Sequence, residues 1–257
     1  MALLQERRGS VAILTFNRPE SLNALNQEAL REFEQAVDAI EHDDEVGAMV
    51  LTGAGDRAFV AGADISQFTH LDLWTSGAFA ERTLALFRRI EVSPKPSIVA
   101  VNGFCLGGGV ELSLSCDIRL ASENAKFGQP EINLGIIPGW GGTQRLQRVV
   151  GPGWARQMIL SGEMVDAQTA LRIGLVNEVL PRELLLDRAV ALAERIGGRA
   201  RKAVALAKQA ILRGQGMPLE DGLKYETAMW QLAFETEDCK EGVAAFLEKR
   251  EAKFKGR

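Results

Sequence analysis

The sequence predicts an α/β protein in which strands gather in the first half of the chain and helices in the second. Residues 97–101 form an apolar, β-branched run that stops at an Asn-Gly pair, which is typical of a buried strand. Amphipathic helical patterns separate this run from the strands expected before it. From about residue 141 onward, helical patterns follow one another with one short interruption. The chain therefore favours a strand-rich core followed by a helical region.

The same patterns place the individual elements. Strands are expected at residues 11–16, 47–52, 97–101, 117–121 and 177–180. Asn26 is a typical N-cap for a first helix that extends to Ile40. Further helices are expected at residues 78–90, 143–149, 154–161, 167–173, 182–196, 199–213, 219–234 and 237–251, with a short buried helix after Leu106. A weak strand-strand-helix rhythm runs through the first part, without enough similarity to form a sequence repeat.

Composition limits the classes of function. At 257 residues the chain has room for one large domain, or for one domain with an appendage. The net charge of −4 supplies no basic field to hold nucleic acid. Three cysteines without framework spacing indicate a reducing compartment. With no signal-peptide pattern and no uninterrupted apolar span, a cytoplasmic protein is expected. The two histidines are not at metal-ligand spacing, so no metal site is expected.

Two glutamates stand alone in apolar, glycine-rich runs. Glu111 is the only formal charge between positions 96 and 116, and Glu131 is the only one between positions 127 and 144. An unpaired carboxylate is costly to bury, and burial raises its pKa. Because proteins keep such groups mainly where a protonation state is used, both glutamates are candidate catalytic residues.

Three consecutive glycines precede Glu111 and indicate an anion-binding turn. Gly107, Gly108 and Gly109 would form the first turn of the short helix, where backbone N–H groups lack helical partners. Without side chains, these residues let an acyl group approach the N–H groups closely. Gly108 and Glu111 are three residues apart and share a helix face, so one segment can present an oxyanion donor and a carboxylate. A tight strand–helix junction with a solvated Glu111 fits the same residues equally well.

A second unusual segment is the bend of small residues at positions 61–65. It lies between apolar segments, and one of its backbone N–H groups could be left free to donate. An ordinary turn capped by Asp64 is the alternative interpretation.

Several short motifs carry a resemblance to a known family. They are Asn-Arg-Pro-Glu at residues 17–20, Asn-Ala-Leu-Asn at 23–26, Ala-Gly-Ala-Asp-Ile at 61–65, Leu-Gly-Gly-Gly-Val-Glu-Leu at 106–112, Phe-Gly-Gln-Pro-Glu at 127–131 and Gly-Gly-Thr-Gln-Arg-Leu at 141–146. With a further match at residues 241–250, they span nearly the whole chain in order. The chain resembles the crotonase superfamily and looks most like the 2-enoyl-CoA hydratases.

The resemblance implies a fold and an assembly. Family members form an α/β spiral of strand-strand-helix (ββα) units, followed by a C-terminal helical region that mediates trimerisation. On this basis residues 1–195 are expected to form the spiral core with the acyl-CoA site, and residues 196–257 the helical region. The expected assembly is a homotrimer or a dimer of trimers.

The resemblance also implies a reaction centre. Ala63 and Gly108 match positions whose backbone N–H groups form an oxyanion hole, and Glu111 and Glu131 match two catalytic glutamates. Hydration of a conjugated thioester needs an enolate-like oxygen to be stabilised and two protons to be moved, so two donors and two carboxyl groups suit it. The implied activity is hydration of 2-enoyl-CoA to 3-hydroxyacyl-CoA. No cofactor is expected, because CoA is part of the substrate.

Further matching positions are expected to contact the acyl-CoA substrate. They are Ala24, Leu25, Ala61, Asp64, Ile65, Leu106, Gly107, Pro130, Gly139, Trp140, Phe254 and Lys255. The last two resemble terminal residues that approach the nucleotide end of CoA, including that of a neighbouring subunit, and a frayed basic tail is the alternative. Two positions depart from many hydratases. Trp140 replaces a small residue, where it either restricts the acyl chain or packs in the core, and Ser66 replaces a basic residue beside the thioester.

Three rival functions are weaker. An enoyl-CoA isomerase or another crotonase-type acyl-CoA lyase would use the same donors, but relatives with one carboxylate tend to be isomerases or hydrolases, so two glutamates favour hydration. RNA binding, known in one branch of the family, relies on a lysine-rich helix. The first helix here is acidic instead, with Arg31 facing Glu28, Glu32, Glu34, Asp38 and Glu41. A non-enzymatic scaffold is disfavoured because both carboxylates and both donors are present.

Overall fold

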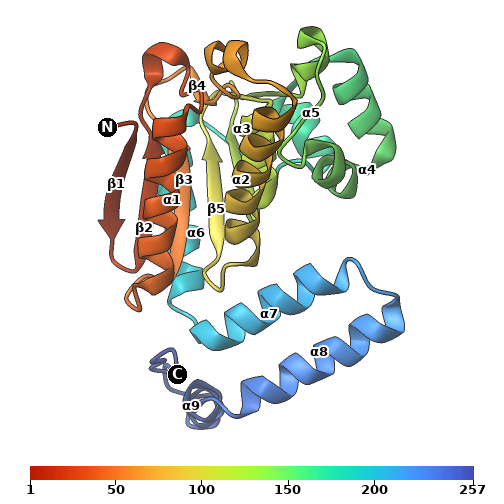
Figure 1. The fold of residues 1–257 in the computed structure, drawn as a ribbon. Coiled ribbons are helices and arrows are strands. Elements are labelled where there is room, and N and C mark those ends of the chain that lie inside the picture. The colour runs from red at the N-terminus through yellow and green to blue at the C-terminus, as the bar shows by residue number, and fades with distance from the viewer.

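Two β-sheets form the framework of the molecule in a computed structural model that describes all of residues 1–257 (Figure 1). The strands are β1 (Leu3–Arg8), β2 (Val11–Phe16), β3 (Ala48–Gly53), β4 (Ala58–Val60), β5 (Ser97–Val101), β6 (Phe104–Leu106), β7 (Ile118–Ser122), β8 (Lys126–Gly128), β9 (Val165–Asp166) and β10 (Glu178–Leu180). The α-helices are α1 (Gln27–His42), α2 (Leu73–Val92), α3 (Gly108–Ser115), α4 (Gly142–Ser161), α5 (Ala167–Arg172), α6 (Arg182–Gly197), α7 (Arg201–Gly214), α8 (Leu219–Phe234) and α9 (Glu237–Leu247). Three short 3-10 helices are η1 (Pro19–Ser21), η2 (Ile65–His70) and η3 (Pro130–Leu134).

The chain winds between the two sheets as a spiral. The larger sheet has the order β1-β2-β3-β5-β7-β10, and all its pairings are parallel except that of β1 with β2. The smaller sheet has the order β4-β6-β8-β9, with β9 antiparallel. Each of β3, β5 and β7 is followed by a strand of the smaller sheet and then by a helix. The predicted α/β class and its strand-strand-helix rhythm are therefore confirmed.

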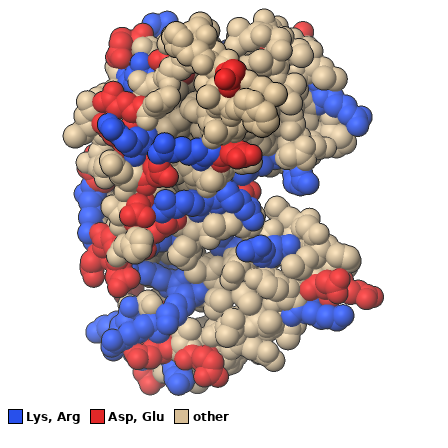
Figure 2. Space-filling view, in the orientation of Figure 1, with Lys and Arg blue, Asp and Glu red and all other residues tan.

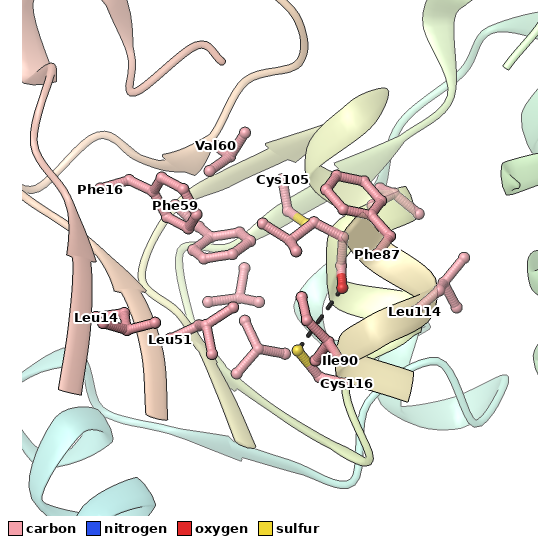
Figure 3. Packing of buried hydrophobic residues seen from close by; sticks show 14 of the residues in the cluster. Leu14, Phe16, Leu51, Phe59, Val60, Phe87, Ile90, Cys105, Leu114 and Cys116 are labelled. Carbon is pink, nitrogen blue, oxygen red and sulfur yellow. Dashed lines mark hydrogen bonds between the residues drawn. The ribbon is translucent and has the colours of Figure 1, made fainter. Parts of the chain in front are cut away.

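Both faces of the larger sheet are covered, as the continuous apolar pattern of its strands requires. Side chains alternate between the faces, so Ile98 packs with α6 through Ala189, while Val99 belongs to the cluster on the opposite face. The cluster with Val99 contains Phe33 of α1 and Phe87 of α2, and Figure 3 shows how part of it packs between strands of both sheets and the helices α2 and α3. Every residue of β5 is buried, which fits its predicted place at the centre of the sheet.

Helix ends follow local capping chemistry. The Asn26 side chain accepts a hydrogen bond from the Ala29 N–H at 2.8 Å, so the predicted N-cap of α1 is confirmed. Helix α2 begins five residues earlier than expected, because Asp72 and Thr75 form a capping box. The span of α4 contains the two predicted helices, which meet where Gly151 leaves the helical conformation with φ 77°.

Two differences from the expected elements lie at the ends of the chain. Strand β1 lies at the edge of the larger sheet, where Leu3 is buried and the other five residues are exposed or half-buried, and no strand was expected there. Helix α9 ends at Leu247, four residues before the predicted end, and Lys249 then adopts a left-handed conformation with φ 55°. Both segments are short and polar, so their hydrophobic periodicity is weak.

The C-terminal helices α7, α8 and α9 form a layer beside the spiral (Figure 1). Lys208 of α7 connects this layer to the core by pairing with Asp117 at 2.8 Å and donating to the Ile90 carbonyl at 3.1 Å. The predicted boundary after residue 195 lies in the last turn of α6, which itself packs on the larger sheet. The division into a core at residues 1–195 and a helical region at residues 196–257 stays a prediction.

Charges on the surface are largely intermixed (Figure 2). The acidic outer face of α1 is partly neutralised by α2, where Arg82 pairs with Glu34 at 2.8 Å and Arg89 pairs with Glu41 at 2.5 Å. None of the helices is both long and apolar enough to span a membrane.

Candidate active site

A cavity of about 520 Å³ lies between the first turns of α2, the start of α3, η3 and the loop before α4. Most of its lining is apolar, as in sites that hold small organic ligands. Eleven predicted site residues line it: Ala61, Ala63, Ile65, Leu106, Gly107, Gly108, Glu111, Pro130, Glu131, Gly139 and Trp140. The cavity therefore brings together residues from three segments, 61–65, 106–111 and 130–140, and both glutamates lie in them.

The backbone N–H of Ala63 is free to donate into this cavity. The Leu25 N–H donates to the Gly62 carbonyl and the Asp64 N–H donates to the Leu25 carbonyl, both at 2.9 Å. In such a parallel bridge, the N–H of the residue between the two bonded groups points to the other side. The Ala63 N–H accordingly has no hydrogen-bond partner in the protein. The bend at residues 61–65 is thus held by its neighbours while one donor stays open.

The N–H of Gly108 is the second open donor. Gly108 is the first residue of α3, so its N–H has no acceptor one turn earlier. All eight residues of α3 are buried, which fixes this helix end against the cavity. A Cβ at Gly108 would lie 2.2 Å from the ring of Trp140, so no larger residue fits here. Two unpaired N–H groups therefore border one cavity, as an oxyanion site requires.

Glu111 is held as a buried hydrogen-bond acceptor. Its side chain is only 2% exposed, so the alternative of a solvated glutamate is wrong. Oε1 accepts hydrogen bonds from the N–H groups of Trp140 and Gly142, each at 2.7 Å, while Oε2 has no partner within the protein. Burial raises the pKa of Glu111, and the two N–H donors and the charge of Arg145 act against that rise.

Glu131 sits in a more open position at the start of η3. It is half-buried, and burial raises its pKa to about 7, with the negative charge of Glu111 adding to the rise. With its nitrogen directed at Glu131, the Gln129 amide donates to both carboxylate oxygens, at 2.9 and 3.0 Å. We assign this orientation because the opposite one makes the amide oxygen face only acceptors. These bonds oppose the rise in pKa and hold the carboxylate beside Gly107.

Trp140 both packs in the core and borders the cavity. Its ring is 5% exposed and lies edge-on to Phe79 and Phe87, with centroid distances of 5.6 and 5.8 Å. These three rings form an aromatic wall between α2 and α3. Packing in the core and restriction of the acyl chain are therefore compatible roles for Trp140.

Three predicted residues near the N-terminal motifs support the bend without lining the cavity. Leu25 is buried and forms the bridge with Ala63. The Ala24 carbonyl accepts a hydrogen bond from Arg18 at 2.7 Å, and Arg18 also pairs with Asp64 at 3.1 Å. Asp64 caps η2, as the turn interpretation predicted.

Ser66, which replaces a basic residue of many hydratases, forms its hydrogen bond within the bend. The Ser66 hydroxyl donates to Asp64 Oδ1 at 2.7 Å, and this bond is the main cause of the lowered pKa of Asp64. The side chain at this position is therefore engaged with the bend itself.

Phe254 and Lys255 do not line the cavity of their own chain, and the C-terminus lies beside α9 (Figure 1). Phe254 packs near Gly242, and the Lys255 N–H donates to Asp238 at 2.6 Å. The chain's end is thus tied to α9, which argues against a frayed tail. A role at a neighbouring subunit's site stays a prediction.

Sequence reasoning missed several residues that shape the site. The first turns of α2 contribute Leu71, Asp72, Leu73, Ser76, Phe79 and Ala80 to the cavity wall. The Asp-x-x-Thr capping pattern at residues 72–75 was the signal that could have placed this helix start correctly. Gln129 was seen within a motif, but its contact with Glu131 depends on tertiary structure.

Comparison with known proteins agrees with this geometry. The sequence model of the enoyl-CoA hydratase/isomerase family matches residues 6–257. The chain is 48% identical to the short-chain-enoyl-CoA hydratase of Clostridium acetobutylicum, with 99% of this chain and 98% of the relative covered. It is 46% identical to the crotonyl-CoA hydratase of Syntrophomonas wolfei, with 98% and 97% covered.

Solved structures agree in fold as well. The crystal structure of the enoyl-CoA hydratase from Bacillus anthracis superposes over the whole of both chains, with a TM-score of 0.96 and 37% sequence identity. This agreement in fold and sequence confirms the crotonase resemblance. The chain therefore belongs to the enoyl-CoA hydratase/isomerase family.

Proposed function

We propose that the protein adds water to the double bond of 2-enoyl-CoA thioesters and produces 3-hydroxyacyl-CoA. The observation that carries this proposal is the meeting of two open backbone donors and two glutamates in one cavity. The relatives named as short-chain-enoyl-CoA and crotonyl-CoA hydratases support the same reaction at 48% and 46% identity.

The two donors suit the thioester oxygen. When a hydroxyl group forms at the β-carbon, negative charge develops on this oxygen as the thioester becomes enolate-like. The N–H groups of Ala63 and Gly108 can bind the oxygen in that state, because neither is used within the protein. Loss of one such donor costs on the order of 100–1000-fold in rate in other enzymes. Both donors are backbone groups, so their position depends on the bend and on the start of α3.

The two glutamates suit the two proton movements. Glu111 takes the role of base, because the two N–H donors on Oε1 favour its ionised form and Oε2 is left to accept a proton from water. Glu131 takes the role of acid, because its pKa is raised to about 7 and a protonated fraction exists near neutral pH. The water oxygen bonds to the β-carbon and Glu131 protonates the α-carbon. Passage of a proton from Glu111 to Glu131 restores the starting state.

The substrate supplies the chemistry that a cofactor would otherwise bring. Conjugation with the thioester already polarises the double bond, so donors and carboxyl groups suffice for addition of water. We accordingly propose an enzyme without a resident cofactor or metal ion, with CoA as part of the substrate and no nucleic-acid partner.

Self-association belongs to the same proposal. The C-terminal helices expose many large apolar side chains: Ile211, Met217, Leu219, Leu223, Trp230, Leu232, Phe234, Val243, Phe246 and Leu247. Such a concentration supports burial against further copies of the chain, as a trimer or a dimer of trimers. Sedimentation velocity would test this, since a monomer at micromolar concentration contradicts it. The three free cysteines support a reducing compartment, and we propose the cytoplasm.

An absorbance assay tests the proposed reaction. Loss of the conjugated enoyl thioester should be followed with crotonyl-CoA and with a longer 2-enoyl-CoA, using purified protein. Rapid loss of absorbance with formation of 3-hydroxyacyl-CoA is expected. Absence of turnover with both substrates would contradict the proposal.

A further inference from the structure

Arg145 of α4 holds the segment that binds Glu111, although it does not line the cavity. Its Nη1 donates to the Trp140 carbonyl at 2.9 Å. Its Nη2 and Nε donate to the two carboxylate oxygens of Glu91 on α2, at 3.1 and 3.4 Å. The guanidinium therefore connects α2 to the loop through one bidentate ion pair and one carbonyl contact.

The contact of Arg145 with the Trp140 carbonyl lies between the two N–H groups that donate to Glu111. The Trp140 N–H and the Gly142 N–H both donate to Oε1 of Glu111, and the Trp140 carbonyl belongs to the peptide group that joins them. Because the peptide group is planar, holding its carbonyl restrains the two neighbouring peptide groups, which can then turn only about the φ and ψ angles of Trp140 and Gly141.

The segment at residues 139–142 has few backbone restraints of its own. Three of its four residues at positions 139–142 are glycines, which have the largest backbone freedom. Gly141 has φ 107°, a conformation that other residues rarely adopt, and a Cβ there would lie against the Arg145 guanidinium. The backbone is thus shaped to admit Arg145, whose contact adds to the packing of the Trp140 ring in restraining the segment.

Both partners of the ion pair are largely shielded from water. The exposed fractions of the side chains are 12% for Arg145 and 19% for Glu91. Arg88 also pairs with Glu91, at 2.6 Å, but makes no contact with the loop. Because water and salt screen a shielded ion pair less than an exposed one, the Arg145–Glu91 pair should hold the Arg145 side chain in place more firmly.

We propose that Arg145, held by Glu91, is a positioning residue that keeps the Trp140 and Gly142 N–H groups on Glu111 during hydration. This inference rests on the proposed function and names a residue outside the cavity that supports its base. Arg145 acts through the loop, since the substrate cavity is lined by Trp140 and Glu111 but not by Arg145.

The charges around Glu111 set the direction of the pH effect. Arg145 on α4 lies near it, with Glu91 and Arg88 beyond on α2, and Glu131 faces the same cavity from η3. The Arg145 charge and the two N–H donors lower the pKa of Glu111 against the effect of burial. Removing the charge and loosening the donors should raise that pKa. Because the base acts in its ionised form, the acidic limb of the rate profile should move to higher pH.

The test compares Arg145→Gln with Arg88→Gln as a matched control, in the full-length protein. For Arg145→Gln, kcat with crotonyl-CoA should fall ~10–100-fold, as for other small misplacements of catalytic groups. KM should stay within ~3-fold, because Arg145 does not line the cavity, and the acidic limb of kcat/KM should move to higher pH. Arg88→Gln removes a charge from the same carboxylate and should leave kcat within ~3-fold and the acidic limb unmoved.

Further variants separate positioning from folding. Arg145→Lys keeps the positive charge but cannot contact both Glu91 and the Trp140 carbonyl. Its acidic limb should therefore return close to the wild-type pH, while its kcat should stay below that of wild type. Glu91→Gln leaves Arg145 without its anchor and should lower kcat less than Arg145→Gln does. If Arg145→Gln fails to fold, Glu91→Gln and Arg145→Lys decide the question, and wild-type kcat and pH profile in both would overturn the proposal.

Failure of this inference differs from failure of the proposed function. A wild-type enzyme that hydrates crotonyl-CoA while Arg145→Gln matches its kcat and acidic limb overturns positioning alone. A wild-type enzyme without hydration overturns the proposed function. Equal affinity of wild type and Arg145→Gln for butyryl-CoA, a saturated thioester, is expected, whereas a large loss of binding would show that Arg145 shapes the whole cavity and would contradict the proposal.

Discussion

Glu111 and Glu131 border the same cavity, but the protein treats the two carboxyl groups differently. Glu111 projects from a fully buried helix, and two backbone N–H groups hold one of its oxygens at 2.7 Å. Glu131 stands on a single 3-10 turn, is half-buried, and is held by the side-chain amide of Gln129. One carboxylate is held by backbone N–H groups, and the other is held by the side-chain amide of the buried Gln129.

The difference shows how two identical side chains can take opposite roles. Backbone donors favour the ionised form and leave one oxygen for water, which suits a base. Burial raises the pKa of Glu131 to about 7, with the negative charge of Glu111 adding to the rise, which suits an acid. The assignment of base and acid therefore depends on the surroundings of each glutamate, and variants at and around the two residues test this difference.

The largest effect is expected when either carboxyl group is removed. Glu111→Gln and Glu131→Gln should each lower kcat at least ~100-fold, because each loses one proton transfer. Affinity for a saturated acyl-CoA should change little, since the amide has nearly the same shape. Steady-state hydration kinetics measure the loss, with the exposed Glu123→Gln as a control that should match wild type. A variant at either site that retains most of its hydration rate would remove that glutamate from the mechanism.

A smaller effect is expected at the aromatic wall. Trp140→Ala should open space beside Phe79 and Phe87 and raise kcat/KM for long acyl chains relative to crotonyl-CoA by ~10-fold, the scale of hydrophobic pocket discrimination. Because the two kcat/KM values are compared within one variant, their ratio is insensitive to the loss of stability that accompanies a core truncation. A chain-length profile identical to that of wild type would mean that Trp140 only packs.

The smallest effect concerns stability. The folded-state pKa of Glu131 is raised from 4.5 to about 7, so the folded protein binds this proton more tightly than the unfolded chain does. Stability should fall as pH rises between these values, and the full penalty of the carboxylate should be present above pH 7.

Glu131→Gln should therefore raise the melting temperature at pH 8 by ~2–4 °C and leave it unchanged near pH 4. Thermal unfolding of both proteins at several pH values measures this. A variant less stable than wild type at pH 8 would show that the Gln129 contact outweighs burial.

Local features of the site could be predicted from the sequence, whereas contacts across the fold could not. The lone Glu111 behind three glycines indicated a buried helix with an open N-terminal donor, because both features lie within one turn. One free N–H was expected from the bend of small residues at positions 61–65, and the family resemblance assigned it to Ala63. Its bridge to Leu25, which orients that donor, joins segments 38 positions apart and has no local signal.

The supporting residues show the same limit. Arg145 and Glu91 are 54 positions apart, and both have ordinary places in amphipathic helices. The terminal Phe254 and Lys255 were assigned to the substrate by resemblance, while the chain itself places them against α9 and not at the cavity. Sequence patterns therefore give the reacting groups more readily than the contacts that orient them.

Incorporation of solvent oxygen tests the central claim most directly. Hydration needs a water molecule held between Glu111 and Glu131, whereas double-bond migration through the same enolate-like state needs only one proton carrier. Turnover of a 2-enoyl-CoA in ¹⁸O-labelled water should place the label on the β-carbon hydroxyl, and a 3-enoyl-CoA should react far more slowly. Rapid conversion of the 3-enoyl to the 2-enoyl thioester without incorporation of label would contradict the hydratase mechanism and identify the two glutamates as an isomerase site.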